Sequence, residues 1–154
     1  MTFTHVDDSG AARMVDVAGK EVTVRTAVAT GRVDLSTETV ALLRGEGVPK
    51  GDVLAVARIA GIMAAKRTPD LVPLCHPIAV HGVTVDLTVD DAGVAVTATV
   101  RTADRTGVEM EALTSVTVAC LTVVDMTKAV DPRSVIQDVQ VESKTGGKSG
   151  SWQR

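Results

Sequence analysis

Asp125 and Lys128 are the residues of this 154-residue chain whose types and spacing point most directly to chemistry. They are three positions apart, which places both on one face of a helix, and they interrupt a run of Val, Leu, Met, Ala, Cys and Thr. A structural ion pair near a helix end would explain them. Charged groups set among apolar ones also make acids and bases with shifted pKa values, so both interpretations stay open.

Two glutamates stand near the start of the same predicted helix. Glu109 follows Thr106 with the Thr-x-x-Glu spacing of a capping box, and helix capping is the better explanation for Glu109 taken alone. Glu111 precedes Asp125 by fourteen residues, so the two share nearly one face but are separated by about 21 Å of helix. One small reacting centre therefore cannot contact both.

His76 lies between Cys75 and Pro77 in the segment TPDLVPLCHP, whose three prolines predict a stiff, extended loop. Such a loop can aim an imidazole for proton transfer or phosphate binding, although a plain loop histidine fits the same sequence. The spacing of the Cys and His residues matches no standard zinc site. We therefore predict no metal.

The C-terminal segment SKTGGKSG, residues 143–150, contains Lys144, Lys148 and three glycines. This composition suits a loop that wraps phosphate with backbone N–H groups. It is not a Walker A motif, which needs a helix after it. A disordered tail is the other interpretation, and we expect residues 1–13 and 143–154 to be flexible.

The elements that must position these residues follow from the hydrophobic pattern. Alternating residues predict four strands, at 21–33, 83–89, 94–100 and 135–141. Helical spacing predicts a short helix from Ser36 to about 44, one from Asp52 to 66 with Val56 and Met63 on its apolar face, and a long one over 108–130. The order predicts an α+β fold of the ferredoxin-like type, βαββαβ with one extra short helix, in which an antiparallel four-stranded sheet packs on helices in a single domain, 1–154.

Composition narrows the function classes. Phe3 and Trp152 are the only aromatic residues in a chain that is 45% hydrophobic, which predicts an aliphatic core. A net charge of −3 with mixed signs leaves no basic field for nucleic acid or an anionic membrane, so any phosphate must be held locally. Two cysteines and an acidic N-terminal stretch predict a cytoplasmic protein. The 108–130 helix is apolar nearly all round, and this surplus predicts subunit contact.

Three long blocks carry a resemblance to a known family: KGDVLAVARIAGIMAAKRTPDLVPLCHPI, TGVEMEALTSVTVACLTVVDMTKAVD and SKTGGKSG, preceded by MVDVAGK. In order and over nearly the whole chain, they resemble the cyclic pyranopterin monophosphate synthase family of molybdenum-cofactor biosynthesis. The resemblance implies conversion of 3',8-cyclo-7,8-dihydroguanosine triphosphate into cyclic pyranopterin monophosphate with release of pyrophosphate. This is a rearrangement without redox, and we expect no cofactor.

The resemblance also implies residue roles. Asp125 of the DMTK block would be the active-site acid or base, Lys128 its basic partner, and Lys50 of KGD another catalytic lysine. The residues implied to contact substrate, or to lie near it, are Leu74, Cys75, His76, Glu109, Met110, Glu111 and Lys144. The family's DMCK block commonly has cysteine, often after an aromatic residue, where this chain has Thr127 and Val124. Neither change removes an ionisable group.

Members of that family look like ferredoxin-type subunits in a hexamer of three dimers, with active sites at the dimer interface. Such an assembly would solve the 21 Å separation, because Glu111 and Asp125 would serve one substrate from different chains. A non-catalytic nucleotide-sensing module is the rival function, since fold does not determine function.

Overall fold

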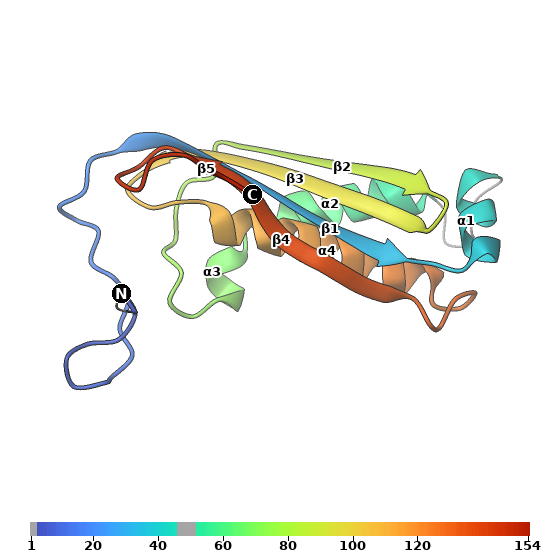
Figure 1. Cartoon of the computed structure of the whole chain (residues 1–154), viewed down its shortest axis with the longest axis horizontal. Coiled ribbons are helices and arrows are strands. Elements are labelled where there is room, and N and C mark those ends of the chain that lie inside the picture. The colour runs from blue at the N-terminus through green and yellow to red at the C-terminus, as the bar shows by residue number, and fades with distance from the viewer. Residues whose placement is uncertain (1–2, 46–51) are drawn as a thin grey trace.

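The computed structural model describes residues 3–45 and 52–154, which form an antiparallel sheet with helices on one of its faces (Figure 1). The elements in chain order are β1 (Thr23–Asp34), α1 (Thr37–Arg44), α2 (Val53–Ala65), α3 (Thr68–Leu71), β2 (Gly82–Asp90), β3 (Gly93–Asp104), α4 (Glu109–Thr127), β4 (Val135–Thr145) and β5 (Trp152–Gln153). The predicted α+β class is confirmed.

The sheet formed by the described residues has five strands in the order β2-β3-β1-β4-β5. Central strand β1 pairs with β3 without a register break, from Thr23 opposite Asp104 to Asp34 opposite Gly93. The sequence predicted four strands, and the structure adds a fifth, β5. The chain turns back after β4, so that Trp152 pairs with Lys144. Two strand residues carry too little periodicity to be recognised in a sequence.

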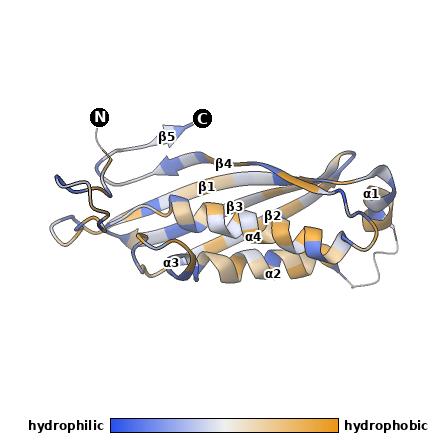
Figure 2. Cartoon of the chain, turned by 90° about the horizontal axis from the view of Figure 1, so that it is seen from below, coloured by the Kyte–Doolittle hydropathy of each residue, from blue (hydrophilic) through white to orange (hydrophobic). Residues whose placement is uncertain are grey.

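Small and medium aliphatic side chains fill the space between the sheet and the helices. α4 packs against β1, β3 and β4, while α2 lies beside α4 and contacts β2 (Figure 2). The fully buried side chains include Val33, Val94, Val96, Val100, Val116 and Val123. Phe3 is 89% and Trp152 45% exposed, so the predicted aliphatic core is confirmed. α4 is long and apolar enough to cross a membrane, but half of its most apolar stretch is buried within the chain, as in a core helix.

The helix ends confirm two predicted caps and correct a third. The side chains of Ser36 and Asp52 cap α1 and α2 by accepting hydrogen bonds from backbone N–H groups. The predicted capping box at the start of α4 is wrong, because Val108 is the N-cap residue and no side chain caps that end. Glu109 is already helical, and its carboxylate is held by a cation instead.

α2 turns part of its predicted core face outward. Val56 and Met63 are 44% and 55% exposed, and Ile59, between them, is 58% exposed. The buried side carries small residues, and a Cβ at Gly61 would lie 3.0 Å from the carbonyl oxygen of Ser115 on α4. Close packing of two helices needs small residues at the contact, so the larger side chains face away from it.

The sequence predicted that segment 68–77 is an extended loop. This is wrong for its first part, because Thr68–Leu71 forms the short helix α3. Pro69 stands in the first turn of α3, where a helix tolerates proline because the missing N–H would have no partner within the helix. The proline pattern therefore fits a helix start as well as a loop. Residues 75–80 have no helix or strand.

We predict that Gly31→Ala destabilises the chain by about 1–3 kcal/mol, because an added methyl overpacks the core. A Cβ at Gly31 would lie 2.6 Å from a methyl carbon of Val116 and 3.1 Å from one of Val139. Urea unfolding measures the loss. Gly82→Ala is the matched control in a strand, since its nearest neighbour would lie 3.9 Å away. Equal unfolding free energies for the two variants would contradict the prediction.

Candidate active site

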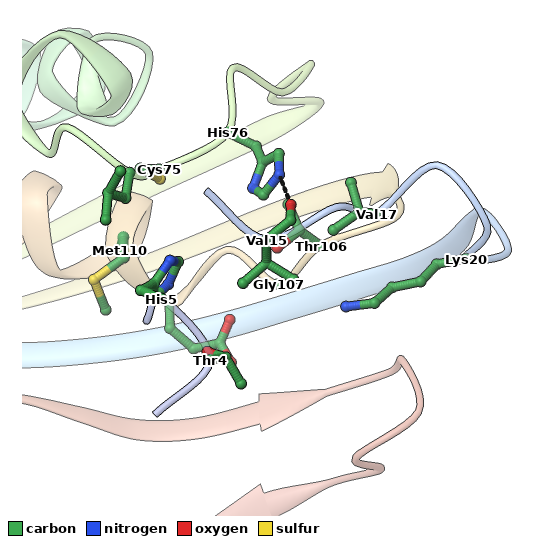
Figure 3. A pocket seen from close by; sticks show the side chains of 12 residues that line it. Thr4, His5, Val15, Val17, Lys20, Cys75, His76, Thr106, Gly107 and Met110 are labelled. Atoms are coloured by element: carbon green, nitrogen blue, oxygen red, sulfur yellow. Dashed lines mark hydrogen bonds between the residues drawn. The ribbon is translucent and has the colours of Figure 1, made fainter. Parts of the chain in front are cut away.

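A cavity of about 380 Å³ lies at the end of the sheet where α4 begins (Figure 3). Its walls come from the N-terminal segment before β1, from the loop before β2 and from the start of α4. Five of the predicted site residues line it: Leu74, Cys75, His76, Glu109 and Met110. Residues from three distant parts of the sequence therefore meet in one site.

The His76 imidazole attaches the N-terminal segment to this cavity. Its Nε2 lies 2.6 Å from the backbone oxygen of Val15 (Figure 3). A carbonyl oxygen only accepts hydrogen bonds, so Nε2 carries the proton and Nδ1 is the basic nitrogen of the neutral ring. His76 is thus both a structural donor and a candidate proton acceptor.

Glu111 lies beneath the cavity rather than in its wall. Its side chain is 1% exposed, and the Cys75 thiol donates a hydrogen bond to Oε1 at 3.5 Å. Within residues 3–45 and 52–154, Oε2 has no hydrogen-bond partner. Burial raises the pKa of the Glu111 carboxyl, and the charge of Glu109 adds to this. Burial, together with Glu111, raises the pKa of the Cys75 thiol to about 11, so the thiol stays protonated at neutral pH.

A second hollow of about 330 Å³ adjoins the first and is lined by cations. Lys20 borders both hollows, and in Figure 3 its ammonium group points toward the first. Arg25, Lys144 and Lys148 complete the cationic group. Glu109, from the first cavity, forms a 2.9 Å ion pair with Lys144, and among the described residues no carboxylate lines the cationic hollow itself. Such a concentration of positive charge favours phosphate groups.

The C-terminal segment forms part of this cationic hollow. Lys144 lies in β4, and its ammonium group donates a hydrogen bond to the Ser149 hydroxyl at 2.7 Å. Gly147 has φ +76°, and any Cβ there would collide with the guanidinium of Arg25. The segment therefore lies against the cationic hollow, and its phosphate-binding role stays a prediction. Whether residues 143–154 are flexible stays a prediction.

Sequence reasoning missed Lys20 and Arg25. Lys20 could have been found, because it ends the MVDVAGK block. Arg25 carried no signal, since an arginine in an alternating strand is normally solvent-exposed. Here it is only 9% exposed, and its Nε donates a hydrogen bond to the backbone oxygen of Asp104 at 2.9 Å.

Asp125 and Lys128 lie at the opposite end of α4 from the cavity (Figure 1). They form an ion pair of 2.6 Å, and their side chains are 58% and 61% exposed. Exposed ion pairs contribute only about 0–1 kcal/mol to stability, so this pair would stabilise the fold only slightly if its role were purely structural. Lys50, the third predicted catalytic residue, lies outside the described residues. The catalytic assignments stay predictions.

The chain combines an α+β fold with two adjoining hollows, one lined by cations and the other by imidazole, thiol and carboxylate groups. This arrangement is typical of the class of proteins that bind phosphorylated small molecules and move protons on them. Within residues 3–45 and 52–154, no three His, Cys, Asp or Glu side chains group closely enough to hold a metal ion. A model described as the MoaC family matches residues 14–147, and the chain belongs to this family.

Curated relatives cover almost the entire chain. It is 72% identical to the cyclic pyranopterin monophosphate synthase of Streptomyces coelicolor, over 99% of this chain and 89% of that protein. It is 69% identical to the protein of the same name from a Nocardioides species, over 99% of this chain and 95% of that protein. Cyclic pyranopterin monophosphate synthase 2 of Mycobacterium tuberculosis is 58% identical to this chain, over 99% of this chain and 91% of that protein.

We predict that Glu111→Gln becomes more stable relative to the natural chain as pH rises. Because the pKa of Glu111 is raised above its ordinary 4.5, the folded state keeps its proton where the unfolded state loses it. The unfolding free energy of the natural chain therefore falls as pH rises from about 4.5 through the raised pKa. In Glu111→Gln this contribution is absent, because a glutamine side chain does not titrate. Urea unfolding across this window measures the difference. A pH-independent difference would contradict the prediction.

Proposed function

We propose that this chain converts 3',8-cyclo-7,8-dihydroguanosine triphosphate into cyclic pyranopterin monophosphate and pyrophosphate. Family membership and relatives named cyclic pyranopterin monophosphate synthase support an enzyme of molybdenum-cofactor biosynthesis. The observation that carries the proposal is the pairing of the two hollows. The cationic hollow suits a triphosphate, and the adjoining cavity of about 380 Å³ has the size of a small-molecule site.

The cations account for the phosphate part of the reaction. When the inner phosphate is attacked and pyrophosphate leaves, negative charge develops on phosphate oxygens. Lys20, Arg25, Lys144 and Lys148 line the hollow in which these oxygens would lie. Because Arg25 is buried and held by a backbone hydrogen bond, its guanidinium is positioned before substrate binds.

The first cavity accounts for proton movement during ring opening and pyrazine formation. Nδ1 of His76 is a basic nitrogen at the cavity wall. The raised pKa of Glu111 shifts its carboxyl toward the neutral form, which can donate a proton. Cys75, Leu74 and Met110 would pack against the heterocycle.

The remaining catalytic groups would come from a second copy of the chain. Glu111 and Asp125 lie on one continuous helix, about 21 Å apart along its axis. Val56, Ile59 and Met63 form an exposed apolar stripe on α2 that a second copy would cover. We assign the chain to a homohexamer built as a trimer of dimers, with each active site at a dimer interface.

The proposal also includes a ferredoxin-like fold type and a location in the cytoplasm. β1, α2, β2, β3, α4 and β4 follow the βαββαβ order of the ferredoxin-like fold, with α1, α3 and β5 added. Cys75 and Cys120 are both free thiols, which suits the reducing cytoplasm.

The rival function is a nucleotide-sensing module without catalysis. It accounts for the cationic hollow but gives no reason for a buried, partly unsatisfied carboxyl beneath the adjoining cavity. No relative reported above is named as a sensor. We therefore prefer the enzyme.

Incubation of the chain with the cyclised triphosphate is expected to yield pyrophosphate and the cyclic monophosphate in equal amounts. Pyrophosphate release and chromatography of the product measure the two. Lys144→Ala should weaken substrate binding, because it removes one cation from the hollow. Tight binding of the triphosphate by the natural chain without turnover would support the sensor instead.

Mixed oligomers test the shared site. Glu111→Gln and Lys128→Ala subunits are expected to be inactive alone but to regain about a quarter of natural turnover when co-expressed. The reason is that half of randomly paired dimers are hybrids, and each hybrid keeps one intact site. Size-exclusion chromatography must show that both variants assemble. Hybrids without activity would place Glu111 and Lys128 in one chain's site.

A further inference from the structure

The N-terminal segment brings to the cavity a residue that no sequence block singled out. His5 lines the same cavity as Cys75, His76 and Met110, although about seventy residues separate it from the nearest of them. Figure 3 shows its imidazole among the side chains that line the cavity. Histidine is the side chain best suited to move protons near neutral pH, so its position in this cavity calls for an explanation.

His5 is held by a small hairpin rather than by a loose tail. Val6 and Ala12 form a β-bridge, and the backbone N–H of Arg13 donates to the His5 carbonyl oxygen at 2.9 Å. The Asp7 carboxylate accepts hydrogen bonds from the Ser9 hydroxyl and from backbone N–H groups of the hairpin, and these bonds lower the pKa of Asp7. The hairpin leads directly to Val15, which His76 holds at the cavity.

The contacts of the His5 ring select its tautomer. Nδ1 lies 3.3 Å from the backbone oxygen of Arg13, which can only accept, so the proton of the neutral ring is on Nδ1. Nε2 then carries the lone pair. No residue in 3–45 or 52–154 hydrogen-bonds to Nε2. His76 shows the reverse arrangement, with its proton on Nε2 and its lone pair on Nδ1.

We infer that His5 is a further catalytic residue, which transfers a proton to and from the substrate through Nε2. The inference rests on the proposed function. Nε2 takes a proton from a nitrogen or oxygen of the substrate, the resulting imidazolium is stabilised by the Arg13 carbonyl, and the proton returns to the substrate at a later step. The ring therefore ends each cycle in its starting state.

The carbonyl of Arg13 suits this role for a physical reason. A hydrogen bond from Nδ1–H to a carbonyl oxygen orients the ring and strengthens as the ring becomes positive. The bond uses only the backbone of Arg13, so the arrangement depends on the hairpin and not on the Arg13 side chain. The other titratable groups that line the cavity are Lys20, Cys75, His76 and Glu109.

Three substitutions at one position separate proton transfer from simple positioning. His5→Asn can still donate to the Arg13 carbonyl but has no group in place of Nε2. His5→Gln can place an amide near Nε2 but cannot exchange a proton, and His5→Ala removes both nitrogens. His81→Gln is the matched control, because the His81 ring accepts a hydrogen bond from the Ala103 N–H at β3 and does not line the cavity.

We expect kcat to fall by on the order of 10²-fold or more in all three His5 variants, with KM changing far less, and to stay unchanged in His81→Gln. Added imidazole is expected to restore part of the kcat of His5→Ala, since it can carry the proton. Natural kcat in both His5→Asn and His5→Gln would overturn this inference but not the proposed function. Loss in His5→Ala with natural kcat in His5→Asn would reduce His5 to a positioning role and would also overturn it. A natural chain that fails to turn over the triphosphate would overturn the proposed function and this inference with it.

Discussion

The packing of α4 against the sheet, with α2 at its side, is the contact on which the rest of the molecule depends. Its 19 residues make a rod of roughly 28 Å, whose buried side is formed by Ala112, Val116, Ala119 and Val123. Because so much aliphatic surface is buried along it, the helix can neither bend nor slide without opening the core. The distance between the end at the cavity and the end that carries Asp125 and Lys128 is therefore set by core packing. A site that used both ends, as proposed above, would have to draw on two chains.

Most of the fold was predictable because strong local signals agreed with the tertiary structure. Alternation marked the four long strands, and Ser36 and Asp52 marked two helix starts. Besides the start of α4, three features escaped prediction. β5 is too short to show a period, proline permitted α3 as readily as a loop, and the rotation of α2 follows from close contact at Gly61, which a single-helix pattern cannot contain.

The site was predictable only in part, and for a different reason. His76, Cys75 and Glu109 stood in recognisable blocks, and the structure brings them to one cavity. Arg25 looked like an exposed strand residue, and His5 stood in a segment expected to be flexible. Both reach the site through backbone hydrogen bonds to distant or turned-back chain segments. Such bonds leave no trace in residue type or spacing.

The cavity also depends on contacts between chain segments that are far apart in the sequence. The N-terminal hairpin, the loop before β2, the start of α4 and the turn after β4 all border the two hollows, so nearly the full length of the chain separates the first wall from the last. Contacts over such separations are slow to form and need the sheet beneath them. A partly folded chain therefore has no binding site, and a ligand that occupies the hollows stabilises the complete fold by mass action. In a cell with abundant substrate, the enzyme would be protected against unfolding by the compound it consumes.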